Sequence, residues 1–225
     1  MPFDAILFDC DGVLVDSEPL THGVLVQMLG EAGWHLTLAQ CMARFLGKAV
    51  RDERAAIEAH TGQPLTEAWM AAFYARRHQA LQQHLQPIAG AAQAVAALHQ
   101  RLGGQVACVS GADRAKVELQ LAKVDLLGFF DGRIFSGQEM PRTKPAPDVY
   151  LAAAAALGVA PARCAVVEDS VTGARAGLDA GAVVFGYAPG GPGHSSAEAL
   201  RTLGVAQVFT DMAELPALLG AGRRL

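Results

Sequence analysis

Four apolar residues run directly into two acidic ones in the stretch Ala5-Ile6-Leu7-Phe8-Asp9-Cys10-Asp11-Gly12. Three more short apolar runs follow along the chain: Val106-Ala107-Cys108-Val109, Ala165-Val166-Val167 and Ala182-Val183-Val184-Phe185. Segments with helical spacing separate these runs and predict helices over residues 112–123, 145–157, 171–180 and 195–203. Continuous apolar strands that alternate with helices are typical of a buried parallel sheet. The sequence therefore predicts an α/β fold.

The segment from residue 17 to residue 86 has a different pattern, because helix follows helix with no convincing strand between them. Apolar side chains recur in it at helical spacing, among them Leu25, Met28, Trp69 and Phe73. We therefore expect a helical insert between the first and second strands of the sheet. The chain would enter and leave it near Asp16 and Pro87, which makes these two crossings candidate hinges.

Composition and charge exclude several classes of protein. The chain has 225 residues, of which 52% are hydrophobic and 18% charged, as in ordinary globular domains. The net charge is −4 and no run of Lys or Arg could follow a phosphate backbone, so nucleic acid is not expected as a partner. We find no membrane-spanning stretch and no signal-peptide pattern, and expect a cytoplasmic protein that is a monomer or a weak homo-oligomer. The four cysteines are expected to be reduced and structural.

Polar residues stand directly behind the apolar runs. They are Asp9 and Asp11 after the first run, Ser110 and Gly111 after the second, and Glu168 and Asp169 after the third. Ligands of open parallel sheets bind beyond the carboxyl ends of the strands, so these side chains should converge, together with Lys144. Crowded carboxylates need a cation, and hard oxygen ligands favour Mg²⁺. Helix-start N–H groups, a hydroxyl and an ammonium suit a phosphate dianion.

Four segments, in this order, resemble the four motifs of the haloacid dehalogenase superfamily. They are Phe8-Asp9-Cys10-Asp11-Gly12-Val13-Leu14-Val15-Asp16-Ser17-Glu18, Val109-Ser110-Gly111, Lys144-Pro145-Ala146-Pro147-Asp148 and Val167-Glu168-Asp169-Ser170. The resemblance covers essentially the whole chain. It implies a Rossmann-like parallel-sheet core, residues 1–16 and 87–225, and a small helical cap domain, residues 17–86, similar to that of phosphoglycolate phosphatase and β-phosphoglucomutase relatives. Phe135-Ser136-Gly137 and the residues after it are more narrowly similar to bacterial sugar-phosphate phosphatases of the 6-phosphogluconate type.

The resemblance also implies roles for the residues of the four motifs. Asp9 would attack phosphorus and form an aspartyl phosphate, while Asp11 would serve as general acid and then as general base. Mg²⁺ would be held by the side chains of Asp9 and Asp169 and the backbone carbonyl of Asp11, with Glu168 nearby or acting through water. Phosphate would be bound by Ser110, Gly111 and Lys144.

Three residues of the insert are weaker candidates for contact with substrate. Arg51 matches the position of a phosphate-binding arginine in β-phosphoglucomutase relatives, and Lys48 lies in the same loop, which resembles the family's specificity loop. Both are also compatible with ordinary surface charge. Asp16 either faces the substrate or caps the first helix of the insert.

Three functions are compatible with these residues. The first is a Mg²⁺-dependent phosphatase for a small phosphorylated metabolite, with sugar or sugar-acid phosphates preferred. The second is a β-phosphoglucomutase-like hexose phosphomutase, which is disfavoured because Thr21 stands where many relatives carry histidine. The third is a catalytically silent binding module, which is disfavoured because crowding Asp9, Asp11, Lys144 and Asp169 together is costly without a ligand.

Overall fold

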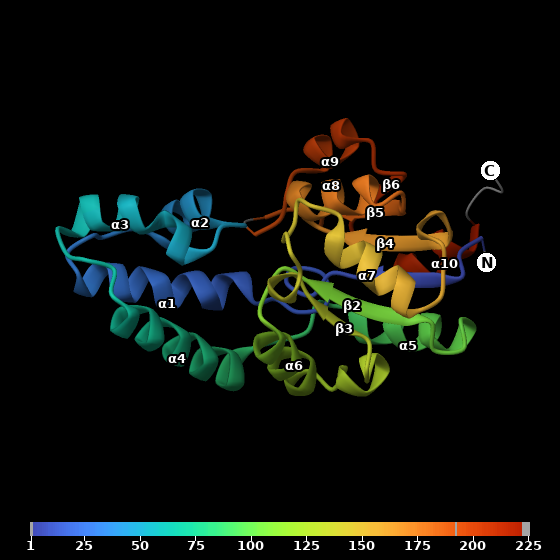
Figure 1. Cartoon of the computed structure of the whole chain (residues 1–225), viewed down its shortest axis with the longest axis horizontal. Helices are drawn as coiled ribbons and strands as arrows, with labels where there is room; N and C mark the ends of the chain where they lie inside the picture. Colours follow the sequence, from blue (N-terminus) through green and yellow to red (C-terminus); the bar gives the residue numbers. More distant parts are fainter. Residues whose placement is uncertain (1, 192, 222–225) are drawn as a thin grey trace. The chain divides into compact units, whose positions relative to one another are not determined.

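A computed structural model describes residues 2–191 and 193–221. Its centre is a six-stranded sheet with the strand order β3-β2-β1-β4-β5-β6, in which every neighbouring pair is parallel (Figure 1). The strands are β1 Ala5–Phe8, β2 Val106–Ser110, β3 Ile134–Ser136, β4 Cys164–Glu168, β5 Val183–Tyr187 and β6 Gln207–Phe209. β2 and β3 extend the sheet on one side of β1, and β4, β5 and β6 then extend it on the other side. The carboxyl ends of β1, β2 and β4 therefore meet at the point where the strand order reverses, where such sheets bind ligands.

The four predicted strands are confirmed, and two edge strands were missed. β1 has the predicted bounds, and β2 and β4 extend one residue beyond their apolar runs, β4 at both ends. β5 begins one residue later than its run and ends two residues later. β3 and β6 lie at the two edges of the sheet, have three residues each, and are only partly buried. An edge strand is covered less completely, so its sequence lacks the continuous apolar run that identifies a central strand.

Both faces of the sheet are covered by helices and turns. The helices outside the insert are α5 Ala91–Arg101, α6 Arg114–Lys123, α7 Asp148–Ala156, α8 Val171–Asp179, α9 Ala197–Leu203 and α10 Leu215–Ala221. Short 3₁₀ turns lie at η2 Leu127–Phe130, η3 Gly137–Glu139, η4 Pro161–Arg163 and η5 Met212–Glu214. Leu7 and Val166 pack on one face with residues of α7, α8 and α9. Phe8, the next residue of β1 after Leu7, points to the opposite face of the sheet. Its ring packs edge to face against Phe130, with ring centroids 6.1 Å apart. Burial on both sides explains why β1 is apolar throughout.

Three of the four predicted helices, α6, α7 and α9, begin two or three residues later than predicted, whereas α8 begins at the predicted residue, Val171. Asp113 caps α6 by accepting from the backbone N–H of Lys116 at 2.8 Å, and Ser170 and Ser196 cap α8 and α9 in the same way. Pro147 stands at the N-cap of α7, which begins at Asp148. Gly158 and Gly181 adopt positive φ after α7 and α8, the conformation that glycine commonly takes at a helix C-terminus.

The helical insert after β1 is confirmed, and it has a core of its own. By its internal contacts the chain forms two compact units: Asp16–Gln86, and the residues up to Val15 together with those from Pro87 onward. The insert comprises α1 Glu18–Glu31, α2 Leu38–Phe45, η1 Val50–Glu53, α3 Arg54–Thr61 and α4 Glu67–His84. Leu25, Leu29, Phe45 and Phe73 are among its buried core residues. The N-cap of α1 is Ser17, so the capping role considered for Asp16 is wrong.

The structure also bears on the expectations for the cysteines and for membrane spans. Cys10, Cys41, Cys108 and Cys164 are all buried free thiols, as expected for structural cysteines. Among the helices of residues 2–191 and 193–221, none combines the length and the apolar character that crossing a bilayer requires.

Candidate active site

The polar residues behind β1, β2 and β4 lie at adjacent strand ends. Asp9 follows β1, Ser110 is the last residue of β2, and Glu168 ends β4 with Asp169 directly after it. Because β2 and β4 flank β1 in a parallel sheet, these side chains leave the same edge. Asp9, Ser110, Glu168 and Asp169 are all at least nine-tenths buried. Burial of this many polar groups at one edge is costly unless they bind one another or a ligand.

Three of the carboxylates form a compact acidic cluster. One carboxylate oxygen from each of Asp9, Glu168 and Asp169 lies within 4.8 Å of the other two. Oxygen donors of this kind suit Mg²⁺, which binds through one or two carboxylates and keeps several waters. The side chain of Asp169 is 6% exposed and stands 4.0 Å from the Nε2 atom of His194. The donor set therefore fits a hard divalent cation.

Lys144 joins two members of the acidic cluster. Its ammonium donates to Asp9 Oδ1 at 2.6 Å, to Glu168 Oε1 at 2.7 Å and to the carbonyl of Val109 at 2.9 Å. The side chain is 7% exposed, so these contacts lie away from bulk water. A buried ammonium between two carboxylates offsets part of their mutual repulsion. Lys144 thus links the segment before α7 to the ends of β1 and β4.

Both oxygens of Glu168 are engaged by protein groups. Oε1 accepts from Lys144 and, at 2.8 Å, from the Tyr150 hydroxyl, whereas Oε2 accepts from the hydroxyl of Ser170 at 3.0 Å. A Cβ atom at Gly173 would overlap this carboxylate, so the first turn of α8 leaves room for it. These contacts favour Glu168 as a residue that acts beside a cation, through water, over one that binds it directly.

Burial and neighbouring charge shift the pKa values of the clustered groups. Burial raises the pKa of Asp9 to about 7; the positive charge of Lys144 opposes the rise, and the negative charges of Glu168 and Asp11 add to it. Burial by itself lowers the pKa of Lys144, but the charges of Asp9 and Glu168 raise it well above its usual range. Without a cation, this site therefore favours a charged Lys144 and a partly protonated Asp9 at neutral pH.

Gly12 allows the loop after β1 to approach Asp169. Its φ is +80°, in the left-handed region, and a Cβ atom there would overlap the Asp169 carboxylate. The carbonyl of Gly12 lies 3.1 Å from Nε2 of His194, the same atom that stands 4.0 Å from the Asp169 carboxylate. Asp169, an expected cation ligand, can therefore occupy its position only because residue 12 has no side chain.

Gly12→Ala should remove stabilisation by Mg²⁺, because the new methyl group displaces Asp169. Gly181→Ala is the matched control, since Gly181 has a φ of +82° and a Cβ atom added to it would meet nothing within 4 Å. Each variant should lose about 1–2 kcal/mol of unfolding free energy from backbone strain. Only Gly12→Ala should also lose the rise in Tm on adding Mg²⁺. Equal Mg²⁺ responses in the two variants would show that Asp169 does not need this space.

Asp11 lies outside the acidic cluster, and its carboxylate is bound by two side chains of α6. Its Oδ1 atom accepts from the ammonium of Lys116 at 2.8 Å and from the amide of Gln120 at 2.7 Å. Both donors belong to α6 and both are buried. Sequence reasoning missed them, because a lysine and a glutamine four residues apart look like the solvent face of a helix.

The remaining phosphate-binding candidates lie in the turn between β2 and α6. Ser110 is buried, and its Oγ atom accepts from the backbone N–H of Ala112 at 3.0 Å. Gly111 is exposed at the start of the turn. The Ser110 hydroxyl therefore shapes the turn, and donation of its proton to a phosphate stays a prediction.

The charged candidates of the insert are paired with acids of the insert. Arg51 makes a two-pronged ion pair with Glu67, with N–O distances of 2.5 and 2.8 Å, and Lys48 lies 3.1 Å from Glu53. Asp16 is exposed at the first position of the insert. These pairs are on the surface, so they would exchange readily for a stronger anion. A substrate role for Arg51, Lys48 and Asp16 remains a prediction.

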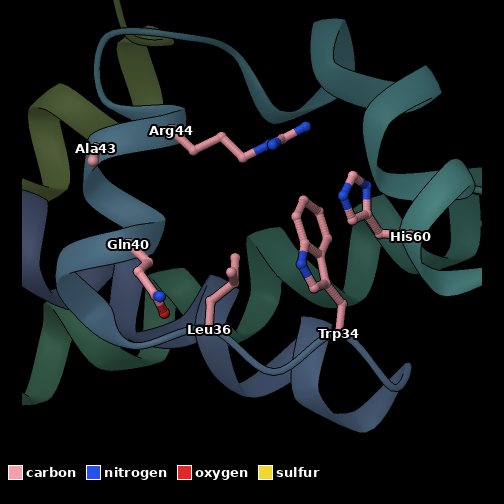
Figure 2. A pocket seen from close by; sticks show the side chains of 6 residues that line it. All are labelled: Trp34, Leu36, Gln40, Ala43, Arg44 and His60. Carbon is pink, nitrogen blue, oxygen red and sulfur yellow. The ribbon is translucent and has the colours of Figure 1, made fainter.

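The insert also carries an open groove of about 450 Å³, lined by Trp34, Leu36, Gln40, Ala43, Arg44 and His60 (Figure 2). The rings of Trp34 and His60 are stacked with centroids 4.1 Å apart, and the guanidinium of Arg44 lies 5.0 Å from the centre of the Trp34 ring. Neither Arg51 nor Lys48 lines this groove, and the groove holds none of the acids of the cluster. We assign it no part in the chemistry.

Comparisons with known proteins agree with the fold. The family model of the haloacid dehalogenase-like hydrolases matches residues 3–181. The 6-phosphogluconate phosphatase of Escherichia coli (strain K12) is 32% identical over 183 residues, which are 81% of each chain.

Two crystal structures are similar over nearly the whole chain. A conserved haloacid dehalogenase-like protein of unknown function from Agrobacterium tumefaciens has a TM-score of 0.83 and 32% identity, covering 97% of this chain and 98% of that one. A haloacid dehalogenase family hydrolase from Deinococcus radiodurans, crystallised with bound phosphate and sodium, has a TM-score of 0.81 and 37% identity, covering 97% and 96%. The match over most of the chain, together with the acidic cluster, places this protein in the haloacid dehalogenase-like hydrolase family, among its phosphatases.

Proposed function

We propose that this chain is a Mg²⁺-dependent phosphatase that hydrolyses a small sugar or sugar-acid phosphate through an aspartyl phosphate on Asp9. The observation that carries the proposal is the meeting of Asp9, Glu168, Asp169 and Lys144 at one sheet edge. Three acids beside one ammonium form a site for a cation and a phosphate together, and neither a structural core nor a neutral binding pocket needs this combination.

In the first step Asp9 attacks phosphorus and the bond from phosphorus to the leaving oxygen breaks. The leaving oxygen keeps the electron pair of that bond and takes a proton from Asp11, so a neutral alcohol departs. Lys144 contacts Asp9 and would neutralise charge on the transferring phosphoryl group, where most catalysis of phosphoryl transfer arises. Ser110 and Gly111 would donate hydrogen bonds to the phosphoryl oxygens.

In the second step a water molecule attacks the phosphorus of the aspartyl phosphate. Asp11, now ionised, takes a proton from that water, and the bond between Asp9 and phosphorus breaks. Phosphate departs and Asp9 returns as a carboxylate, so atoms and charge balance over the cycle.

Asp9, Asp169 and the backbone carbonyl of Asp11 are the proposed ligands of Mg²⁺, with Glu168 acting through water. When bound, Mg²⁺ supplies positive charge that reduces repulsion among the carboxylates and neutralises the phosphoryl group. This charge is needed because the cluster holds three acidic side chains, whereas Lys144 supplies one positive charge and contacts only Asp9 and Glu168.

The helical insert is proposed to act as a cap that selects the substrate. Arg51 and Lys48 would exchange Glu67 and Glu53 for an anionic group of the substrate distal to the phosphate. A sugar-acid phosphate carries such a group, and the 32% identical relative is a phosphatase for one. The crossings at Asp16 and Pro87 would be the hinges.

Phosphate release from a panel of esters tests the proposal. The panel comprises sugar phosphates, sugar-acid phosphates, phosphoglycolate and nucleotides, each with Mg²⁺ and with EDTA. We expect Mg²⁺-dependent release, fastest with sugar or sugar-acid phosphates. Isomerised product in the presence of a bisphosphate would support the mutase alternative. A chain that binds a protein partner and releases no phosphate from any ester would be the silent binding module.

A further inference from the structure

We infer that Lys116 and Gln120 are positioning residues that orient the carboxyl group of Asp11 for proton transfer. This inference rests on the proposed function, because it concerns the proton that leaves Asp11 in the first step. Its basis is the geometry of α6, which brings two buried donors to one oxygen atom of Asp11.

The two donors are delivered by consecutive turns of one helix. Lys116 and Gln120 are four residues apart, so their side chains lie one above the other on the same face of α6. Asp113 caps the helix by accepting from the backbone N–H of Lys116, which anchors the turn that carries the ammonium. Both side chains are therefore presented to Asp11 from a rigid element and not from a loop.

The burial of Lys116 and Gln120 would destabilise the fold if Asp11 did not accept their hydrogen bonds. Gln120 is completely buried and Lys116 is 9% exposed. A buried amide or ammonium without partners would cost several kcal/mol, and an apolar residue at either position would pack at no such cost. The amide of Gln120 is held at both ends, since its oxygen accepts from the Cys10 thiol at 3.6 Å while its nitrogen donates to Asp11. This orientation is the one that makes Gln120 a donor to the carboxyl group.

The two hydrogen bonds to Oδ1 restrict how the carboxyl group of Asp11 can transfer a proton. Oδ1 has two lone pairs, and here it accepts from Lys116 and from Gln120. When Asp11 is neutral, its proton therefore belongs on Oδ2. The donors also set the plane of the carboxyl group, because both hydrogen bonds prefer to lie near that plane. Lys116 and Gln120 would thus select the oxygen that gives its proton to the leaving group.

The leaving group provides a readout that a general loss of structure would not change. An alkoxide needs a proton as it departs, whereas p-nitrophenolate and acetate leave without one. Lys116→Met and Gln120→Leu should each lower kcat/KM for an alkyl phosphate by about 10–100-fold. The same variants should lower kcat/KM for p-nitrophenyl phosphate or acetyl phosphate less than about threefold. The ratio of the two values does not depend on how much of the sample is folded.

Lys123→Met is the matched control, since it removes the same charge from an exposed position of the same helix. It should leave the ratio unchanged. A double-mutant cycle gives a second readout: in the Asp11→Asn background, Lys116→Met should have no further effect on alkyl phosphates, because a positioning residue acts through the group it positions.

The outcomes separate this inference from the proposed function. If the unmodified protein releases phosphate from neither class of ester, the proposed function fails. If it is active and the variants lose equal factors on both classes, or lose nothing, the role of Lys116 and Gln120 is rejected and the phosphatase stands. Additive losses in the Asp11→Asn background would reject it as well.

Discussion

Asp9→Asn is expected to lower phosphate release by at least about 10⁴-fold while the chain stays folded, as when the nucleophile of a covalent mechanism is removed. The amide has nearly the shape of the carboxylate but cannot form an aspartyl phosphate. Lys144 keeps Glu168 as a partner, so no buried charge is left without a counter-charge. Steady-state rates with Mg²⁺ measure the loss, and circular dichroism checks the fold.

The same variant should be more stable than the unmodified protein when EDTA removes the cation. The pKa of Asp9 is about 7 in the folded chain, against an ordinary value of 3.8. The folded state therefore binds the proton of Asp9 more tightly than the unfolded state does. The contribution of Asp9 to the free energy of unfolding falls as pH rises from about 4 through 7. Asparagine does not titrate, so its advantage should grow between pH 5 and pH 8 by on the order of 2 kcal/mol.

Asp4→Asn is the control for this experiment, because Asp4 precedes the same strand but forms an exposed ion pair with Arg163. It should retain activity and show no such gain in stability. Substantial turnover by Asp9→Asn would reject Asp9 as the nucleophile, whatever its effect on stability.

Lys144→Met should damage both stability and catalysis. Removing the ammonium leaves Asp9 and Glu168 buried side by side without the positive charge that each contacts at 2.6–2.7 Å. Breaking a buried ion pair in this way typically costs about 3–5 kcal/mol. The pKa of Asp9 should rise further, because the charge that opposes the effect of burial is gone. Turnover should fall by roughly 10²–10³-fold for lack of one charge on the phosphoryl group.

Mg²⁺ gives this prediction its specific signature. A cation in the acidic cluster would replace part of the lost positive charge, so adding Mg²⁺ should raise the Tm of Lys144→Met more than that of the unmodified protein. Thermal unfolding with EDTA and with Mg²⁺ measures both shifts, and Lys123→Met is the control for removing an exposed charge. An equal Mg²⁺ response in both proteins would mean that Lys144 and the cation do not share the same carboxylates.

Short apolar runs were sufficient to predict the central part of the fold. A strand buried on both faces must be apolar throughout, and such runs identified β1, β2, β4 and β5. The helical insert was predictable for a related reason, since its helices needed an apolar face for a core of their own. The edge strands β3 and β6 have no continuous apolar run in the sequence, because a strand that is only partly buried can also contain polar residues.

By itself the sequence determined which residue types lie at the site, since Asp9, Ser110, Glu168 and Asp169 stand directly behind apolar runs, and parallel strands end at one edge of the sheet. Only the tertiary structure decided which of these groups touch. It placed Lys144 between Asp9 and Glu168, and it gave Asp11 the partners Lys116 and Gln120. The physical reason is that hydrogen bonds and ion pairs depend on positions within a few tenths of an ångström, whereas the apolar pattern that positions a strand or helix leaves the partners of each polar side chain open.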